Sequence, residues 1–284
     1  MNAGNLFIFL YHRVLPEVRF NPLNTMMTIK EFEKQVDALA SHYSIISMAE
    51  ALQKIKEQSL FKNHAVLTFD DGYCDNYEIV FPILKKKGIR ALFSVVTNYI
   101  GSNRPLWDWE FLSSLKGDCP ESVNVGEKKL KRRFFENKLA FGRRVLEQMK
   151  RARTADIELV LRQLKNGASY DDSFAIDRCL NWDELKTMSL HGMEIASHSL
   201  SHRSLSHLSL EDALHEIRES KRVLEKKMGT TCDTFSFPFG SSRDISDSLM
   251  KHIEQAGYLC GLLNIDGIND MTTDPFGFKR IIMS

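Results

Sequence analysis

The sequence predicts an α/β protein whose strands form a parallel sheet, either open or closed into a barrel. Short apolar runs alternate with amphipathic segments over most of the 284 residues, and residues typical of helix ends separate them. Polar clusters follow four of the predicted strands. About seven strands interleaved with helices lie parallel in one sheet, because each helix returns the chain to the edge at which the previous strand began. The chain is long enough for one large α/β domain.

Helix-capping signals define the elements of the first third of the chain. Thr28 is the expected N-cap of an amphipathic helix, and Ser47 followed by Glu50 has the pattern of a capping box. Gly88 can end a later helix, which Pro82 can kink. In chain order we predict strand 5–11, helix 28–43, a helix that begins after residue 47, strand 64–70, helix 76–88 and strand 89–97.

The same alternation resumes near residue 181. Asn181 is the expected N-cap of a helix, with Glu184 three residues later and Gly192 after its end. Gly229 can end a long charged helix. The predicted elements are helix 181–192, strand 193–197, helix 209–228, strand 234–237, helix 244–257 and strand 258–264.

One segment, at about 101–180, does not follow this rhythm, and we interpret it as an insertion within a single domain that spans 1–284. Its stretch 127–153 contains eleven Lys and Arg against three Glu, and the spacing of Leu139, Leu146 and Met149 suggests a helix. Two interpretations stay open. The stretch is a solvated helical insertion, or it is an electropositive lid or docking surface for a phosphate-bearing substrate or an anionic membrane, giving peripheral membrane association.

Composition sets limits on the partners and the location. The formal net charge of +1 does not indicate a polyanionic partner, and we expect no nucleic-acid partner. The five cysteines are scattered without a CxxC pair, which argues against a disulfide framework and a zinc-thiolate site and favours a reducing compartment. The apolar run near the N-terminus is too short for the core of a secretory signal. We therefore expect a cytoplasmic protein.

The four polar clusters lie at the carboxyl ends of strands, where parallel α/β folds gather their catalytic groups. They are Tyr11-His12 after the first strand, Asp70-Asp71 after "AVLTF", "SHSLSH" at 197–202 and "PFG" at 238–240. Because these ends meet at one edge of the sheet, we expect the four clusters to lie close together.

Two of these clusters predict a metal site. His198 and His202 are four residues apart, so a helical or tightly turned backbone puts both imidazoles on one face. With Asp71 they make three protein ligands and leave a fourth position open, as in catalytic zinc sites. Asp70 would then be free to act as a base. Two alternatives remain: His207 is a rival ligand, and "DDGY" is simply a turn before a helix N-terminus.

The motifs "TFDDG", "HSLSH" and "FPFG", in this order, resemble those of the NodB-type polysaccharide deacetylases, carbohydrate esterase family 4. The resemblance extends from Phe7 to about Ile282, apart from the insertion. It implies a distorted (β/α) barrel of about seven parallel strands, with the basic helical insertion added to it. It also implies that the cofactor is a divalent metal such as Zn²⁺.

The resemblance also implies a role for each motif residue. Asp71, His198 and His202 would bind the metal, and Asp70 would be the general base. The backbone N–H of Phe239, which follows Pro238, would help to hold the oxyanion of the tetrahedral intermediate.

The sequence departs from the family pattern at two places. Family members commonly carry an arginine before the proline of the third motif, where this chain has Ser236, and many carry a histidine near the C-terminus, where this chain has none. However, "LYHRV" near the N-terminus resembles a permuted branch of the family, similar to the poly-N-acetylglucosamine deacetylases, in which this histidine lies on the first strand. His12 is then the expected general acid. Arg280 is the candidate for the missing guanidinium beside Asp70.

The resemblance predicts a metal-dependent hydrolase that removes an N-acetyl or similar N-acyl group from an amino sugar in polysaccharide or glycoconjugate biosynthesis. The substrate would be an N-acylated amino sugar, which could be linked to a lipid or a nucleotide. Two alternatives stay open for Trp107: it stacks on the sugar ring, or it is a buried anchor of the insertion. Two other functions are alternatives. A metal phosphohydrolase with an aspartate nucleophile is disfavoured by two imidazole ligands. A catalytically degenerate, glycan-binding barrel is disfavoured by the complete ligand set.

Overall fold

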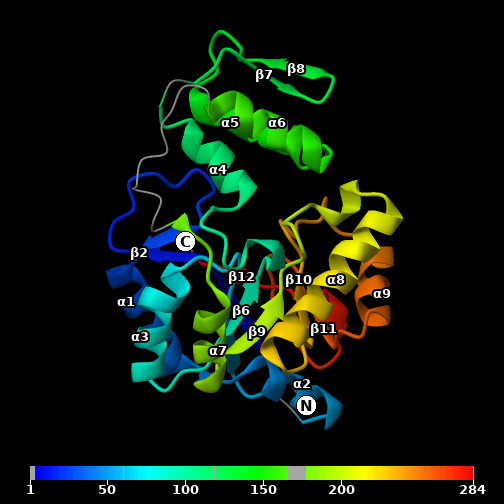
Figure 1. Ribbon diagram of the computed structural model, residues 1–284. Helices are drawn as coiled ribbons and strands as arrows, with labels where there is room; N and C mark the ends of the chain where they lie inside the picture. The colour runs from blue at the N-terminus through cyan, green and yellow to red at the C-terminus, as the bar shows by residue number, and fades with distance from the viewer. Residues whose placement is uncertain (1–3, 60, 118, 166–176, 284) are drawn as a thin grey trace. The chain divides into compact units, whose positions relative to one another are not determined.

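The computed structural model describes residues 4–59, 61–117, 119–165 and 177–283, and it divides into two compact units (Figure 1). The first unit comprises 1–102 and 179–284, and the second comprises 103–178. The second unit therefore corresponds to the insertion expected at about 101–180, of which residues 118 and 166–176 lie outside the described part. Among the described helices, none combines the length and the apolar character needed to span a bilayer.

The first unit contains an eight-stranded parallel sheet. Seven strands follow the order β11-β10-β9-β6-β5-β1-β12, and β4 pairs with β5 beside that path. The strands are β1 Leu6–Tyr11, β4 Ser44–Ile45, β5 His64–Phe69, β6 Leu92–Val95, β9 Glu194–Ser197, β10 Thr234–Ser236, β11 Cys260–Leu262 and β12 Ile281–Ile282. Two further short strands, β2 Arg13–Leu15 and β3 Met26–Thr28, form a separate parallel pair.

The two ends of this sheet meet. The segment that leads into β12 is hydrogen-bonded to the chain at and after β11: the Leu263 N–H donates to the Phe278 carbonyl at 2.8 Å, and the Arg280 N–H donates to the Ile265 carbonyl at 3.0 Å. Together with the isolated bridge between Leu262 and Phe278, these bonds close the sheet on itself. The predicted α/β class and the distorted (β/α) barrel are confirmed.

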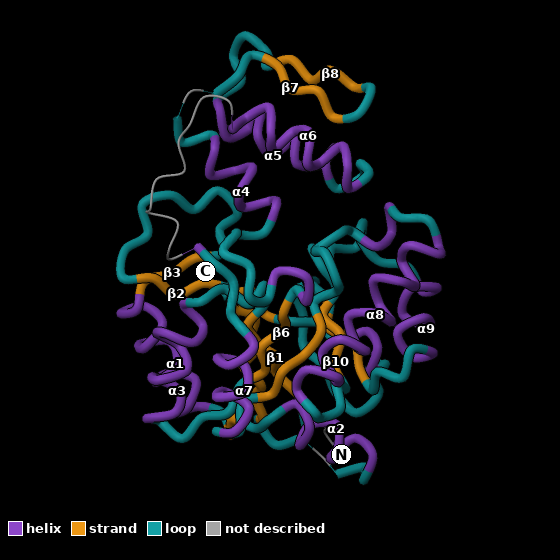
Figure 2. The backbone as a smooth tube through the Cα atoms, in the orientation of Figure 1, coloured by secondary structure: helices purple, strands orange, loops and turns teal. Residues whose placement is uncertain are grey.

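The helices of the first unit pack around the barrel (Figure 2). Thr28, Ser47 and Asn181 each begin a helix within a capping box, as predicted, and Gly229 ends one at φ 71°. The predicted helix at 76–88 instead begins as a π-helix, Asn76–Val80, before Pro82. The α-helices are α1 Ile29–His42, α2 Met48–Lys56, α3 Phe81–Lys86, α7 Trp182–Leu190, α8 Leu210–Met228 and α9 Asp247–Gln255.

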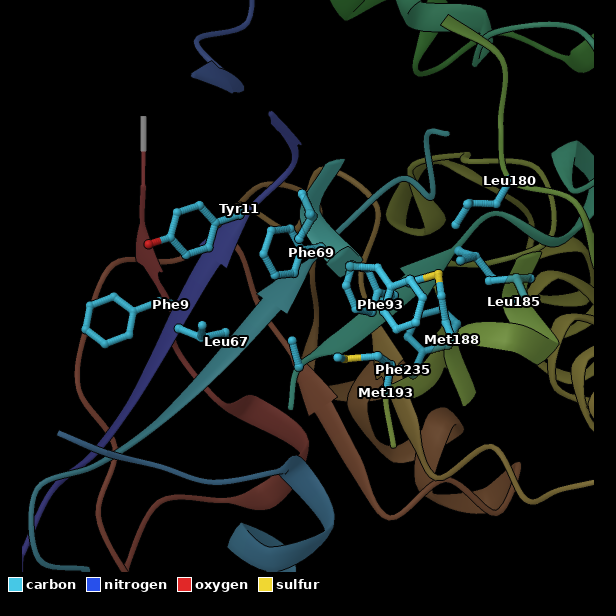
Figure 3. Packing of buried hydrophobic residues seen from close by; sticks show 14 of the residues in the cluster. Phe9, Tyr11, Leu67, Phe69, Phe93, Leu180, Leu185, Met188, Met193 and Phe235 are labelled. Atoms are coloured by element: carbon cyan, nitrogen blue, oxygen red, sulfur yellow. The ribbon is translucent and has the colours of Figure 1, made fainter. Parts of the chain in front are cut away.

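Alternating side chains divide the hydrophobic core into two layers, because successive residues of a strand point to opposite faces of the sheet. Tyr11, Phe69 and Phe93 occupy neighbouring positions on β1, β5 and β6 and stack in a row on the outer face (Figure 3), with centroid distances of 5.2 and 4.9 Å. The outer layer packs against the surrounding helices. The intervening positions fill the barrel interior, together with Met48 and Ala51 of α2.

The second unit combines three helices with a hairpin: α4 Trp107–Ser114, β7 Ser122–Val125, β8 Lys128–Lys131, α5 Lys138–Met149 and α6 Thr154–Lys165. The expected helical insertion contains α4, α5 and α6, and it also contains a hairpin that was not expected, with β8 and a turn before α5. The physical reason is that Val123 and Val125 of β7 are buried, and β7 packs against α5 and α6 (Figure 1). The hairpin pairing extends this packed strand, whereas the lysines of β8 carry no strand signal of their own.

Candidate metal and catalytic site

The alternation of side chains along the strands directs the candidate residues into one end of the barrel. Asp70 continues the inward-facing set of Val66 and Thr68, and His198 continues that of Ala196. The backbone of both residues still belongs to the sheet: the Asp70 N–H donates to the Tyr11 carbonyl at 3.0 Å, and the His198 N–H donates to Val95 at 2.9 Å. Both side chains therefore project from rigid strand ends.

The turn after β5 brings Asp71 to the same place. Asp71 and Gly72 both have left-handed backbones, at φ 77° and 76°, so the chain reverses sharply. A Cβ at Gly72 would approach Val95 Cγ1 to 2.9 Å, so both its φ and its close contact with β6 require glycine. The sharp turn is the reason why two adjacent aspartates point to different partners.

Asp71, His198 and His202 form a group that fits a divalent metal. The Asp71 Oδ1 atom lies 3.5 Å from His198 Nε2 and 3.4 Å from His202 Nε2. One ligand atom from each residue lies within 4.8 Å of the others. Two imidazoles and one carboxylate match the donors of a catalytic zinc site. His207 belongs to no such group within the described part of the chain.

The hydrogen bond of His198 sets which of its nitrogens faces the other ligands. Its Nδ1 lies 2.9 Å from the Ser236 carbonyl, so Nδ1 carries the proton and donates to that carbonyl. Nε2, which lies on the side of Asp71, keeps its lone pair free to bind a metal. A metal-binding histidine is commonly fixed by such a bond to a carbonyl group. The Ser236 side chain, which stands where family members carry arginine, bonds instead to Ser94 across the barrel at 2.7 Å.

Glu216, which is not among the residues predicted from the sequence, shapes the loop that carries the two histidines. This buried carboxylate of α8 accepts hydrogen bonds from the N–H groups of Leu200 at 2.9 Å and Ser201 at 2.8 Å, and also from the Ser201 hydroxyl. Within the same loop, Ser199 and His202 have positive φ angles of 66° and 57°. A strained loop of this kind keeps its shape only where its surroundings determine it.

We expect Glu216→Gln to weaken metal binding by about 10- to 100-fold, as replacement of outer-shell partners typically does. The amide cannot accept all three hydrogen bonds, so His202 loses part of its support. Titration of the apoprotein with Zn²⁺ measures the affinity, and kcat at saturating Zn²⁺ should change less than the affinity. Glu211→Gln, an exposed position on the same helix, is the matched control. Equal affinities of the two variants would show that Glu216 does not position the ligands.

Asp70 is held by Arg280, which reaches it from the other end of the sequence. The Arg280 guanidinium donates two hydrogen bonds to the Asp70 carboxylate, at 2.9 and 2.7 Å, and its Nε donates to the Leu263 carbonyl at 2.8 Å. Both side chains are buried. Burial raises the pKa of Asp70, but the charge of Arg280 and its hydrogen bonds are the main effects that oppose this, and the pKa lies below its usual value. Asp70 is therefore ionised at neutral pH.

His12 follows β1 and interacts electrostatically with both aspartates. Burial lowers the pKa of His12, and the charges of Asp71 and Asp70 oppose this effect without cancelling it. Its buried Nδ1 has no hydrogen-bond partner among the described residues. The His12 carbonyl accepts a hydrogen bond from Asn76 Nδ2 at 2.9 Å, which anchors this loop.

A second buried ion pair supports the His12 loop from the same turn that carries Asp71. Asp75 accepts hydrogen bonds from Arg13 Nε and from the Val14 N–H, each at 2.9 Å. Asp75 and Asn76 are not among the residues predicted from the sequence, although their signal lies in "DDGYCDN", where polar residues continue beyond the turn.

The third motif forms a tight turn beside His202. The Gly240 N–H donates to the Pro238 carbonyl at 2.7 Å, and Phe239 between them has φ 61°. The Phe239 ring lies 4.8 Å from the His202 ring, measured between centroids. Trp107, by contrast, lies on α4 of the second unit and is 2% exposed, so its expected contact with a sugar ring stays a prediction.

Sequence comparison with known proteins finds relatives that are named as deacetylases. YxkH of Bacillus subtilis (strain 168), named as a polysaccharide deacetylase, is 20% identical over 257 residues, which are 90% of this chain and 64% of YxkH. The poly-beta-1,6-N-acetyl-D-glucosamine N-deacetylase of Staphylococcus epidermidis is 35% identical over 80 residues, or 28% of each chain. The chain thus spans less than two thirds of the length of either relative.

Solved structures show the same fold. The deacetylase PplD of Streptococcus pyogenes, in complex with acetate, superposes with a TM-score of 0.64 at 18% identity, covering 99% of this chain and 93% of PplD. IcaB from Ammonifex degensii gives a TM-score of 0.65 at 16% identity, covering 99% and 92%. The profile of the family described as polysaccharide deacetylase matches residues 58–261. Because that match covers well over half of the chain, this protein belongs to the polysaccharide deacetylase family, the NodB-type deacetylases of carbohydrate esterase family 4.

Proposed function

We propose that this protein is a metal-dependent N-deacetylase that hydrolyses the acetamide of an amino sugar. One observation carries the proposal: in a member of this family, Asp71, His198 and His202 converge on one point, and a carboxylate fixed by Arg280 lies beside them. The name of the staphylococcal relative supports an N-acetylglucosamine polymer as the class of substrate. An N-formyl or other small N-acyl group would be open to the same chemistry.

Asp71, His198 and His202 would hold the metal, which we take to be Zn²⁺ because of the two imidazole donors. When bound, such an ion polarises the amide carbonyl and lowers the pKa of a water molecule. The His198–Ser236 bond presents Nε2 to this position, and Glu216 maintains the loop that carries both imidazoles. The ligands are thus oriented before any substrate arrives, which is a requirement for efficient catalysis.

The proton transfers would be divided between two side chains. Asp70 is ionised and accepts the proton of the attacking water, while the bidentate Arg280 pair keeps its oxygens in place. His12 would donate a proton to the nitrogen of the leaving amine as the C–N bond breaks. Because burial lowers the pKa of His12, its imidazole must first take up a proton, and the charges of Asp71 and Asp70 favour that charged form. The Phe239 N–H would stabilise the negative charge that develops on the carbonyl oxygen.

The test is acetate release from N-acetylglucosamine oligosaccharides by the full-length protein. We expect release to stop after treatment with a chelator and to return when Zn²⁺ is added. Lipid-linked and nucleotide-linked N-acetyl sugars form the second arm of the assay, because the linkage of the natural substrate stays a prediction, as does the cytoplasmic location. Turnover that is unaffected by removal of all metal would contradict the proposed mechanism.

A further inference from the structure

The second unit carries a pair of aromatic side chains that the chain leaves uncovered. Phe134 and Phe135 lie in the turn between β8 and α5, and their side chains are 95% and 94% exposed. The next most exposed large apolar residue in the described part is Leu190, at 85%, which stands alone at the end of α7. Two adjacent phenylalanines in this position expose a continuous apolar surface to water, and such surfaces commonly mark interaction sites.

The turn that presents the two rings is rigid. The Glu136 N–H donates to the Arg133 carbonyl at 3.0 Å, and the Glu136 carboxylate accepts a hydrogen bond from the Arg133 N–H at 3.0 Å. Arg144 of α5 donates to the same carboxylate at 2.9 and 2.7 Å and to the Lys131 carbonyl at 2.7 Å. The one acidic side chain of the turn is thus neutralised by Arg144. The aromatic pair is presented in a fixed geometry, so little ordering would be needed on binding.

Basic side chains lie near the aromatic pair. Lys129 and Lys131 lie opposite Asn124 and Ser122 in the hairpin, on the face away from the buried Val123. Together with Arg132, Arg133 and Phe134 they line a hollow of about 630 Å³, to which Ser122 and one acidic residue, Glu121, also contribute. Within the described chain, none of Lys129, Lys131, Arg132 and Arg133 has a carboxylate within ion-pair distance, whereas other basic residues of the unit do.

We propose that this surface, comprising Lys129, Lys131 and residues 132–135, docks the protein onto an anionic phospholipid bilayer. Aromatic side chains partition into the interfacial layer of a membrane, and lysine and arginine side chains beside them interact with acidic headgroups. A free phosphate would engage the cations but would gain nothing from two phenyl rings at the tip of a turn.

The geometry of the two rings also disfavours a single-stranded nucleic acid. Such ligands stack successive bases on separate, accessible aromatic faces. Phe134 and Phe135 instead meet edge to face, with centroids 4.9 Å apart and planes at 86°. They form one compact apolar protrusion, which is suited to insertion between lipid headgroups. The inference concerns the second unit alone and does not depend on the reaction proposed for the barrel.

The test is flotation of the full-length protein with phosphatidylcholine vesicles, with and without phosphatidylglycerol. We expect binding only to vesicles that contain phosphatidylglycerol, and weaker binding as salt is added, because exposed charges are screened. Phe134→Ser/Phe135→Ser should lower the vesicle affinity by about tenfold or more. Lys129→Gln/Lys131→Gln should lower it by roughly 25-fold at low ionic strength, about fivefold for each cation.

Matched controls separate docking from general effects. Leu190→Ser removes an exposed apolar side chain from the first unit, and Lys30→Gln/Lys34→Gln removes two exposed cations from α1. Both controls should bind vesicles as the wild type does, and all variants should melt at the same temperature. The proposal is overturned if wild type ignores phosphatidylglycerol, or if the phenylalanine variant binds normally. It is also overturned if that variant only changes the oligomeric state, or if the wild type binds an oligonucleotide but no vesicle.

Discussion

Asp70→Asn should lower kcat for acetate release by about 10²- to 10⁴-fold while the protein still binds its metal. The amide has nearly the shape of the carboxylate, so the turn that carries Asp71 should be retained. It cannot accept a proton, however, so the attacking water would lose its base. The measurement is kcat at saturating substrate, together with the zinc content of the purified variant by mass spectrometry.

Two comparisons make this prediction decisive. Asp37→Asn, which removes an exposed carboxylate of α1 that pairs with Lys87, should leave kcat unchanged. His202→Ala should lose zinc together with activity, whereas Asp70→Asn should lose activity alone. If Asp70→Asn and the wild type released acetate at equal rates, Asp70 would not be the base. If the variant lost its zinc, the separation of roles between Asp70 and Asp71 would be wrong.

The parts of the fold that local sequence determines were predicted well. Helix starts follow from side chains that bond to the backbone within four residues, so Thr28, Ser47 and Asn181 could be read directly. The ends of the strands can be predicted from the ends of apolar runs. Because ligands gather at the carboxyl ends of parallel strands, the polar clusters after these runs could be expected to lie together. The structure brings Asp71, His198 and His202 within ligand distance of one another, although none of this tests their roles.

The rest depends on contacts between distant segments, which no local pattern encodes. The short strands β2, β4 and β12 have two or three residues each, which is too few to show an alternation of apolar and polar side chains. They form because neighbouring strands offer free hydrogen-bonding edges. Glu216 resembles any solvated glutamate of a charged helix until the loop above it is known. The turn at Phe134 follows from packing of β7 against helices, while the sequence around it shows only a basic stretch.

Arg280→Met should destabilise the protein by about 3–5 kcal/mol at neutral pH, the usual cost of removing one partner of a buried ion pair. Asp70 would remain buried without its guanidinium, and the carbonyl of Leu263 would lose its donor. The free energy of unfolding is measured by urea titration. Arg280→Met should also lower kcat, because the orientation of Asp70 is lost along with its charge partner.

The pH dependence of this loss has a definite sign. In the wild type the pKa of Asp70 lies below its usual value of about 3.9, so the ion pair stabilises the fold above that pH and its contribution is lost as the pH falls through the folded-state pKa. Without Arg280, the largest opposing charge is gone, so we expect burial to raise the pKa of Asp70. The stability difference between variant and wild type should therefore be largest at neutral pH and should shrink as Asp70 becomes protonated in acid.

The double variant Asp70→Asn/Arg280→Met distinguishes a buried ion pair from mere loss of packing. With both charges gone, no isolated charge is left in the barrel, so this variant should be more stable than Arg280→Met alone, although it should be inactive. Strictly additive losses would mean that the two side chains do not interact in solution. Arg280 would then not be the group that holds the base, and the missing arginine before Pro238 would have no replacement in this chain.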